Sequence, residues 1–399
     1  MPKFRTSNPL AATIISNAPW AATGYGTQTK QLALRMIRDG HSMAVSNNYG
    51  LEATSTVWEG IEVYPKGGDG AYSNDIVVAN AKDWSRRNPK AKPVIFTLYD
   101  CWVFLGHPSW DKVDIPIVSW VPIDHMPTPP KVRKWLERED VTPVAMSHYG
   151  SAQLAAAGID HHCIPHGIET SLYKPTPTVR DAGGVRRTGR ELMGVPEDAH
   201  VTGIINANKG TAIIRKAFAE QLMAWAIFAK DRPDAWLYLH TEFGGGMGGI
   251  PLQPILDAVG APMDRVRKVN QYQFRVGVPD EAMAAIYTGL DVLMAPTLGE
   301  GFGLTVAEAG ACGTRAIVQD FTAQPELIAD GWLVGGQPLW DPAQEAWFSI
   351  PSVPQIGEAL ALAYDGPRET SEKARQHIVD KYDADMIYET GWRPLWESL

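Results

Sequence analysis

Residues 291–309 of this 399-residue chain read DVLMAPTLGEGFGLTVAEA. The apolar run Asp291–Ala295 predicts a buried strand of a parallel sheet. Pro296 and Gly299 interrupt the pattern, and Leu304–Ala311 predicts a helix. A strand, a glycine-rich turn and a helix form half of a βαβ unit, and ligands of open α/β sheets bind at the carboxyl ends of such strands. The stretch therefore predicts an α/β fold with a ligand site at this turn.

The turn and the helix offer groups that can bind hydroxyls and groups that can bind a phosphate. Glu300 lies in the turn and Glu308 in the helix, and carboxylates of this kind accept hydrogen bonds from hydroxyls. Glycines on either side of an aromatic residue let a ligand approach the backbone, and the free N–H groups at a helix start favour a phosphate. Carboxylates for hydroxyls beside amides for phosphate suit a nucleotide-sugar, which would be the sugar donor. The residues predicted to bind this donor are Gly301, Phe302, Gly303, Leu304 and Glu308, beside Glu300.

The sequence Glu-Gly-Phe-Gly from Glu300, followed by Glu308 after seven intervening residues, resembles the signature of the retaining GT-B glycosyltransferases of group 1. The resemblance extends to Cys312-Gly313-Thr314 and Glu326-Leu327-Ile328. It implies two Rossmann-like domains whose parallel sheets face a central cleft. It also implies that Glu300 contacts hydroxyls of the donor sugar and that Glu308 holds the ribose of the nucleotide.

Length and composition predict a globular protein of two domains. A chain of 399 residues exceeds one ordinary core, and 45% apolar and 20% charged residues are typical of globular proteins. No apolar run approaches the roughly 20 residues that a membrane helix needs. Three scattered cysteines favour a reducing compartment, and we expect a cytoplasmic location.

The net charge of −9 is unevenly distributed along the chain. Residues 1–165 contain 16 Lys and Arg against 15 Asp and Glu, whereas residues 166–399 contain 20 against 30. The resulting charge of −10 makes the second half a poor surface for nucleic acid. The first half contains two basic clusters, which are Lys82, Arg86, Arg87, Lys90 and Lys92, and Lys131, Arg133, Lys134 and Arg138.

Strands and helices alternate on both sides of a linker. The predicted strands are 11–16, 75–79, 93–99, 115–121 and 143–146, then 201–206, 235–240 and 291–295; the main predicted helices are 27–38, 131–139, 151–157, 216–230 and 304–311. Periodicity stops near residues 173–178. We therefore expect an acceptor-side domain at 1–178 and a nucleotide-sugar-binding domain at 179–372. By resemblance to the family, residues 373–399 return to the first domain, with Trp392 and Trp396 as anchors.

Two adjacent cations stand where a diphosphate leaving group would need them. Asn208 follows a predicted strand, and Arg215 and Lys216 open the next predicted helix. Family members carry an Arg and a Lys about five residues apart here, whereas Arg215 and Lys216 are adjacent. The pair is therefore Arg215 with Lys216, or one that includes Lys209. Tyr272 lies where family members cover the donor base.

Gly24 and Gly26 lie between the first strand and the first helix, and the resemblance implies that they face the donor phosphates. The third glycine of a dinucleotide fingerprint is missing, so this signal is weak, and no acidic residue ends a second strand in the expected way, which disfavours a dehydrogenase. Neither half contains the Gly-x4-Gly-Lys-Ser/Thr phosphate loop, which excludes a P-loop nucleoside triphosphatase.

Polar residues also follow strands in the first domain. Asp124 and His125 end one strand, and by resemblance a histidine here contacts the donor sugar while a polar neighbour meets the acceptor. Tyr99-Asp100 and His107 are lesser candidates on the same rim. Several tryptophans, Trp102, Trp110, Trp120 and Trp135, suit stacking on sugars or bases.

The predicted activity is transfer of a sugar from a nucleoside diphosphate to an acceptor hydroxyl, with retention implied by the resemblance. Glu300, Asp124, His125, Arg215 and Lys216 are the predicted catalytic residues. No Asp-x-Asp or His/Cys ligand pattern indicates a metal, and no cofactor is expected beyond the nucleotide-sugar co-substrate. The acceptor is a saccharide, a glycan, a protein side chain or a hydroxylated DNA base. An epimerase or phosphorylase of the same fold, and a non-catalytic sugar-nucleotide-binding module, are the alternatives.

Overall fold

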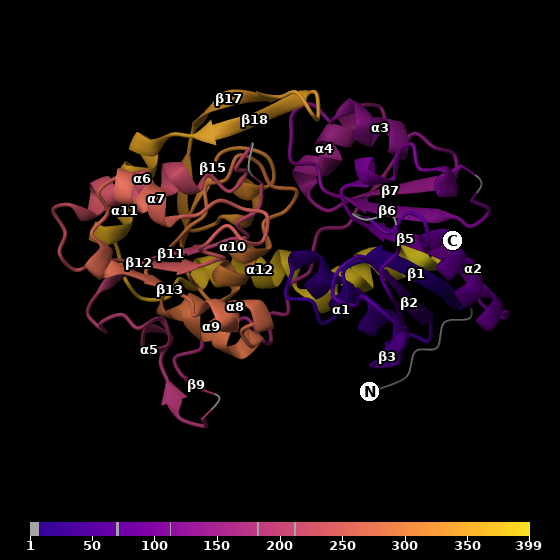
Figure 1. The fold of residues 1–399 in the computed structure, drawn as a ribbon, viewed down its shortest axis with the longest axis horizontal. Helices are drawn as coiled ribbons and strands as arrows, with labels where there is room; N and C mark the ends of the chain where they lie inside the picture. Colours follow the sequence, from indigo (N-terminus) through magenta and orange to yellow (C-terminus); the bar gives the residue numbers. More distant parts are fainter. Residues whose placement is uncertain (1–7, 69–71, 112, 182, 211–212) are drawn as a thin grey trace. The chain divides into compact units, whose positions relative to one another are not determined.

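The computed structural model describes residues 8–68, 72–111, 113–181, 183–210 and 213–399, and these form two compact units (Figure 1). One unit contains the chain up to Gly167, Pro342–Ala346 and Ala384–Leu399; the other contains Ile168–Asp341 and Trp347–Asp383. The division falls at Gly167 rather than after residue 178, and the returning segment starts at 384 rather than at 373. Residues 373–383 group with the second unit because α12 (Glu372–Tyr382) packs on α10 (Leu304–Ala311).

The first unit is built on an eight-stranded sheet with the order β3-β4-β2-β1-β5-β6-β7-β8. All its neighbouring strands pair in parallel except β3 with β4. Every residue of β1 is buried, as expected for a strand covered on both faces. The strands are β1 (Leu10–Ser16), β2 (Ser42–Asn47), β3 (Thr56–Trp58), β4 (Ile61–Tyr64), β5 (Lys92–Leu98), β6 (Ile117–Val121), β7 (Val141–Ala145) and β8 (His162–Cys163).

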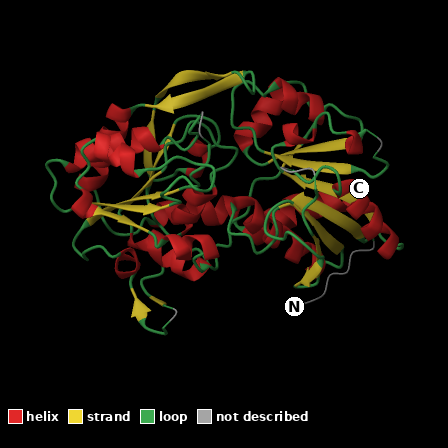
Figure 2. Ribbon diagram, in the orientation of Figure 1, coloured by secondary structure: helices red, strands yellow, loops and turns green. Residues whose placement is uncertain are grey.

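Helices flank this sheet (Figure 2). They are α1 (Gly24–Arg38), α2 (Val77–Arg87), α3 (Pro130–Leu136), α4 (His148–Ala156), α13 (Ala384–Ile387) and α14 (Arg393–Ser398). The strand predicted at 75–79 is wrong, because these residues lead into α2. Its buried residues Val77, Val78, Ala81 and Trp84 recur at helical spacing, which a five-residue window did not reveal.

An aromatic cluster attaches the C-terminal segment to the first sheet. Trp392 and Trp396 are both 2% exposed and stack on each other with ring centroids 5.1 Å apart. Phe96 of β5 meets both rings edge-on, at 5.3 and 5.9 Å, and Trp120 of β6 meets Trp392 at 4.8 Å. Residues distant in sequence thus complete the core of the first unit.

The second unit is built on a parallel six-stranded sheet with the order β13-β12-β11-β14-β15-β16. Its strands are β11 (His200–Ile205), β12 (Ala235–His240), β13 (Val266–Lys268), β14 (Val292–Met294), β15 (Ala316–Gln319) and β16 (Gly331–Val334). Two ribbons lie outside this sheet, β9 (Val179–Arg180) with β10 (Arg186–Arg187), and β17 (Gly336–Asp341) with β18 (Ala346–Pro351).

The helices of the second unit also flank its strands (Figure 2). They are α5 (Gly189–Met193), α6 (Phe218–Ala229), α7 (Gln253–Ala258), α8 (Gln271–Val276), α9 (Asp280–Gly289), α10, α11 (Val353–Asp365) and α12. Because β14 ends at Met294 and α10 begins at Leu304, residues 295–303 lie at the carboxyl edge of the sheet. Among the described residues, no helix has the length and apolar character needed to cross a membrane.

Candidate functional site

Glu300 is a buried carboxylate in the turn between β14 and α10, with 8% of its surface exposed. The Thr297 hydroxyl donates to Glu300 Oε1 at 2.9 Å, and the backbone N–H of Glu300 donates to Thr322 Oγ1 at 2.9 Å. The position of Glu300 is therefore fixed through both its side chain and its backbone. The motif did not single out Thr297 or Thr322.

Arg215 and Lys216 both contact the Glu300 carboxylate. Arg215 Nη1 donates to Glu300 Oε2 at 2.9 Å and to the Gly299 carbonyl at 2.5 Å, while Lys216 Nζ donates to Oε1. Burial alone would raise the pKa of Glu300, but the two cations outweigh it and lower the pKa to about 2. The cluster thus combines an acid that is ionised at neutral pH with two cations at a strand end.

The prediction that the two cations open the next helix is wrong, because α6 begins at Phe218. They precede Ala217, which caps α6 with φ +48° and ψ +40°, in the left-handed region. Such a backbone is uncommon for a residue with a Cβ and persists only where its surroundings enforce it. Here Ala217 is fully buried against Leu298 and Phe348.

Three chain segments support this cluster side by side. The Leu298 N–H donates to the Arg215 carbonyl at 2.8 Å, and the Ser349 N–H donates to the Leu298 carbonyl at 3.0 Å. Phe348 of β18 packs against both Leu298 and Ala217. The β17–β18 ribbon, which the sequence did not predict, therefore holds the segments that carry Arg215 and Glu300.

Glu308 occupies a different environment, on the partly buried face of α10. Its Oε2 accepts a hydrogen bond from the Tyr287 hydroxyl at 2.8 Å. Burial raises the pKa of Glu308 to about 7, and nearby Asp280 adds to the rise. The two acids of the motif thus differ in charge state near neutral pH.

The glycine-rich turn uses its residues mainly for structure. Gly303 has φ +115° and caps α10, a conformation that L side chains rarely adopt. Phe302 is 3% exposed, and its ring meets Tyr382 of α12 edge-on at 5.5 Å. The ring is therefore closed to a ligand. Gly301 is buried and Leu304, the first residue of α10, is partly exposed.

Asn208 anchors a loop by its side chain. Its amide donates to the carbonyls of Glu242 and Ile250, at 2.9 and 2.6 Å, and accepts from the Ile250 N–H at 3.1 Å. These bonds fix the glycine-rich loop that follows β12. Tyr272, at the start of α8, has 74% of its surface exposed.

In the first unit, Asp124 and His125 follow β6 and bond to each other. His125 Nδ1 lies 2.7 Å from Asp124 Oδ1, and the Tyr149 hydroxyl donates to the His125 carbonyl at 2.9 Å. His125 is 4% exposed, while Asp124 is partly exposed. An acid that orients a histidine in this way also fixes its tautomer.

Gly24 and Gly26 lie in the first turn of α1, not in the loop before it. The Thr23 side chain caps this helix by accepting from the Gly26 N–H at 3.0 Å. A Cβ on Gly26 would lie 2.3 Å from the Ala21 carbonyl oxygen, so close backbone packing requires this glycine.

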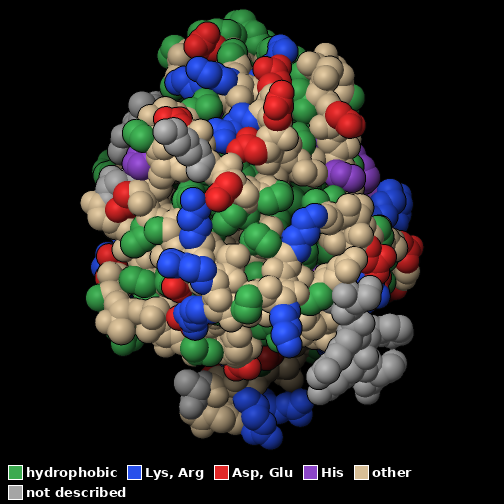
Figure 3. All heavy atoms as spheres, turned by 90° about the vertical axis from the view of Figure 1, so that its right-hand side faces the viewer, with side chains coloured by type: hydrophobic (Ala, Val, Ile, Leu, Met, Phe, Trp, Pro, Cys, Tyr) green, Lys and Arg blue, Asp and Glu red, His purple; other side chains and the backbone are tan. Residues whose placement is uncertain are grey.

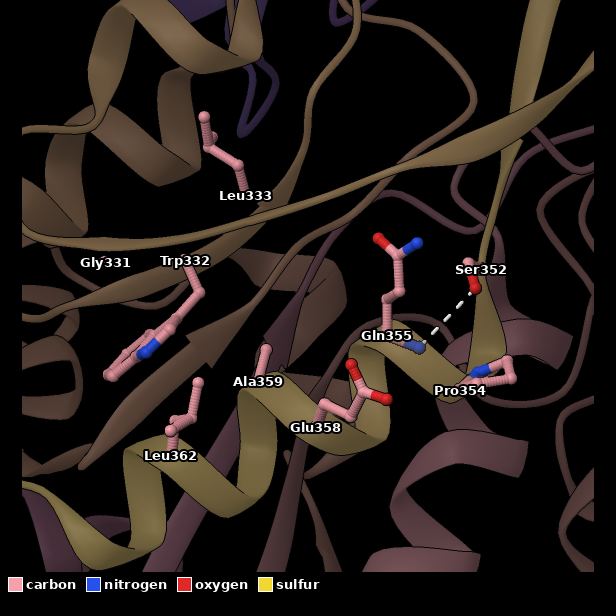
Figure 4. A pocket seen from close by; sticks show the side chains of 9 residues that line it. All are labelled: Gly331, Trp332, Leu333, Ser352, Pro354, Gln355, Glu358, Ala359 and Leu362. Atoms are coloured by element: carbon pink, nitrogen blue, oxygen red, sulfur yellow. Dashed lines mark hydrogen bonds between the residues drawn. The ribbon is translucent and has the colours of Figure 1, made fainter.

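Figure 4 shows a groove of the second unit that is separate from these residues. It lies between β16 and α11 and is lined by Gly331, Trp332, Leu333, Ser352, Pro354, Gln355, Glu358, Ala359 and Leu362. None of the predicted donor or catalytic residues lines it, and we do not assign it a role. Within the described ranges, no group of three His, Cys, Asp or Glu side chains could hold a metal ion.

The family model described as "Glycosyl transferases group 1" matches residues 253–346, which include the turn with Glu300 and the helix with Glu308. The lipopolysaccharide core biosynthesis mannosyltransferase LpcC of Rhizobium leguminosarum bv. viciae is 29% identical over 205 residues, covering 50% of each chain. A D-inositol 3-phosphate glycosyltransferase of Paenarthrobacter aurescens is 28% identical over 193 residues, covering 47% of this chain and 40% of the relative. The matched region spans half or less of the length of these curated relatives.

Solved structures share the fold over nearly the whole chain. Sucrose-phosphate synthase from Thermosynechococcus elongatus has a TM-score of 0.75 at 18% identity, covering 98% of this chain and 100% of the other. WaaG, a glycosyltransferase involved in lipopolysaccharide biosynthesis, has a TM-score of 0.66 at 14% identity, covering 95% and 97%. The chain therefore has the GT-B fold, and its residues 253–346 match the group 1 glycosyltransferase family.

Proposed function

We propose that this protein transfers a sugar from a nucleoside diphosphate to an acceptor hydroxyl, with retention at the anomeric carbon and without a metal ion. The observation that carries the proposal is the Glu300–Arg215–Lys216 cluster at the carboxyl end of β14. Two cations beside the buried carboxylate of the family motif supply charge for both the leaving diphosphate and the sugar.

The chemistry requires that an anionic diphosphate depart while positive charge grows on the sugar ring. Arg215 and Lys216 would stabilise the departing diphosphate, taking over the charge that a metal ion supplies in other transferases. Glu300, ionised at neutral pH because its pKa is about 2, would hold the sugar hydroxyls. Donor binding would have to draw the cations partly away from Glu300, to which they are now bonded.

The remaining predicted residues have supporting roles in this proposal. Glu308 would accept the ribose hydroxyls, and the N–H groups of Gly303 and Leu304 would face the phosphates. Tyr272 would cover the base with its exposed ring, and Asn208 would act through the loop that it anchors. In the first unit, His125, oriented by Asp124, would contact the sugar.

A saccharide or glycan fits the surface better than nucleic acid does. Several cations of the two basic clusters are bonded to nearby acids: Lys82 to Asp114 at 3.1 Å, Arg87 to Glu62 at 2.9 Å and Arg133 to Glu137 at 3.0 Å. On the face shown in Figure 3, Lys and Arg side chains are interspersed with Asp and Glu and form no continuous basic stripe. Matched charges of this kind give phosphate backbones little to bind.

The test is release of nucleoside diphosphate from a panel of nucleotide-sugars, with and without acceptors. Glu300→Gln should lower turnover by about 100-fold or more, the order of effect of removing one preorganised polar group from a site. Glu358→Gln is the matched control, because Glu358 is exposed on α11 in the groove of Figure 4. Equal turnover by the two variants would refute the proposal.

A further inference from the structure

Three strands of the first sheet end in a single polar network. Asn17 follows β1, Asn48 follows β2 and Tyr99 follows β5. The Tyr99 hydroxyl donates to Asn17 Oδ1 at 2.7 Å and accepts from Asn48 Nδ2 at 2.8 Å. Tyr99 is 8% exposed, and burial raises its pKa to about 12. The network therefore fixes a neutral aromatic residue at the carboxyl edge, where ligands of parallel sheets bind.

Further aromatic rings lie beside Tyr99, and one of them belongs to a tyrosine that contacts Asp100, the next residue. The ring centroids of Tyr25 and Tyr99 lie 5.1 Å apart. The Tyr72 centroid lies 6.3 Å from that of Tyr99 and 6.2 Å from that of Trp102. The Tyr25 hydroxyl donates to Asp100 Oδ2 at 3.2 Å. We call these five residues, Tyr25, Tyr72, Tyr99, Asp100 and Trp102, the Asp100 cluster.

Tyr99 is buried in the core of the first unit, whereas the other four residues of the cluster are not. Tyr25, Tyr72, Asp100 and Trp102 are all partly exposed. The other tryptophans considered as stacking residues, Trp110, Trp120 and Trp135, are each 1% exposed and serve as core. Trp102 is thus the one residue of that predicted set whose ring remains partly accessible in the described structure.

A carboxylate among partly exposed aromatic rings has the chemistry to bind an uncharged sugar. The carboxylate accepts hydrogen bonds from neighbouring hydroxyls, and the aromatic faces pack against the C–H face of a pyranose. The same carboxylate opposes a phosphate group, because two like charges at close range repel. The cluster therefore discriminates between a sugar and its phosphate ester.

We propose that the Asp100 cluster binds the acceptor, and that the acceptor is an unphosphorylated carbohydrate. This inference rests on the proposed function and specifies its second substrate. It separates this chain from the matched relative whose name specifies inositol 3-phosphate. Asp100 and Trp102 are specificity-determining residues in this proposal and take no part in departure of the diphosphate.

The experiment compares neutral acceptors with their phosphate esters, using glucose, mannose and myo-inositol against the corresponding monophosphates. Nucleoside diphosphate release is measured without acceptor, as donor hydrolysis, and then with each acceptor. We expect at least one neutral acceptor to stimulate release over hydrolysis, and its phosphate ester to stimulate less at equal concentration. Preference for the phosphorylated member of each pair would overturn the inference.

Variants separate acceptor binding from donor chemistry. Asp100→Asn should leave donor hydrolysis unchanged and raise KM for the neutral acceptor about tenfold, the loss of one charged hydrogen bond. The same variant should also prefer the neutral acceptor over its phosphate ester by a smaller factor than wild type does. Trp102→Ala, a second variant at a partly exposed position, should raise the same KM a few-fold through lost stacking. Asp160→Asn, at an exposed acid of the same unit, is the matched control and should change neither value.

The outcomes distinguish the two proposals. Normal donor hydrolysis together with an unchanged acceptor KM in both Asp100→Asn and Trp102→Ala would overturn the acceptor site alone. Absence of hydrolysis and transfer from every donor in the wild-type protein would overturn the proposed function and this inference together. Saturation-transfer NMR with the neutral sugars gives a readout without turnover, and signals equal in wild type and Asp100→Asn would also overturn the inference.

Discussion

Replacing Glu300 by Gln removes the charge that Arg215 and Lys216 neutralise while keeping the size of the side chain. The pKa of Glu300 falls from an ordinary 4.5 to about 2 on folding. This difference corresponds to about 3 kcal/mol of stability at pH 7. Because the folded-state pKa is lowered, that stability is present above pH 4.5 and is lost as the pH falls through about 2. At pH 3 about half of it should remain.

The assay is urea unfolding of wild type, Glu300→Gln and Glu358→Gln between pH 3 and pH 7. The stability difference between wild type and Glu300→Gln should be about 3 kcal/mol at pH 7 and should shrink by about half at pH 3. Glu358→Gln should stay within about 0.5 kcal/mol of wild type, as surface substitutions do. A difference for Glu300→Gln that is independent of pH, or no larger than that of the control, would refute the electrostatic account of the cluster.

Three other variants test neighbouring features. Because folding raises the pKa of Glu308 to about 7, the free energy of unfolding falls as the pH rises from 4.5 towards 7. Glu308→Gln should therefore be more stable than wild type at pH 8, by up to about 3 kcal/mol in urea unfolding. Calorimetry should nevertheless show that this variant binds nucleoside diphosphate more weakly. Phe348→Ala should lose about 3 kcal/mol and also weaken diphosphate binding, whereas Leu360→Ala, in the other core cluster of the same unit, should lose stability without changing affinity. Asn208→Ala should speed proteolysis of the loop after β12, measured by mass spectrometry, and an unchanged cleavage rate would contradict its role as an anchor.

Local patterns were sufficient for much of the fold. The strand predicted at 235–240 and the helix predicted at 304–311 match β12 and α10, because an apolar run and a helical period are visible within a few residues. The prediction at 75–79 was wrong because the window was too short to show the helical spacing of Val77, Ala81 and Trp84. The sequence prediction puts Gly24 and Gly26 before the helix because glycine usually marks a loop, whereas both lie in its first turn, where close packing on the Ala21 carbonyl requires Gly26.

The candidate site was only partly visible in the sequence. Glu300 could be identified from its motif, but its ion pairs with residues about 85 positions earlier depend on how β11 and β14 are paired. Phe348 could not be found, because its contacts with Ala217 and Leu298 exist only once the β17–β18 ribbon has folded. The opposite pKa shifts of Glu300 and Glu308 likewise arise from burial and partners that no spacing specifies.

The aromatic anchor of residues 384–399 has a consequence for synthesis of the protein. Phe96 and Trp120 are covered by Trp392 and Trp396, which a ribosome translates only after nearly all of the second unit. The nascent first unit therefore exposes these rings while its neighbour is being made, and a chaperone that recognises apolar surface would engage it during that interval.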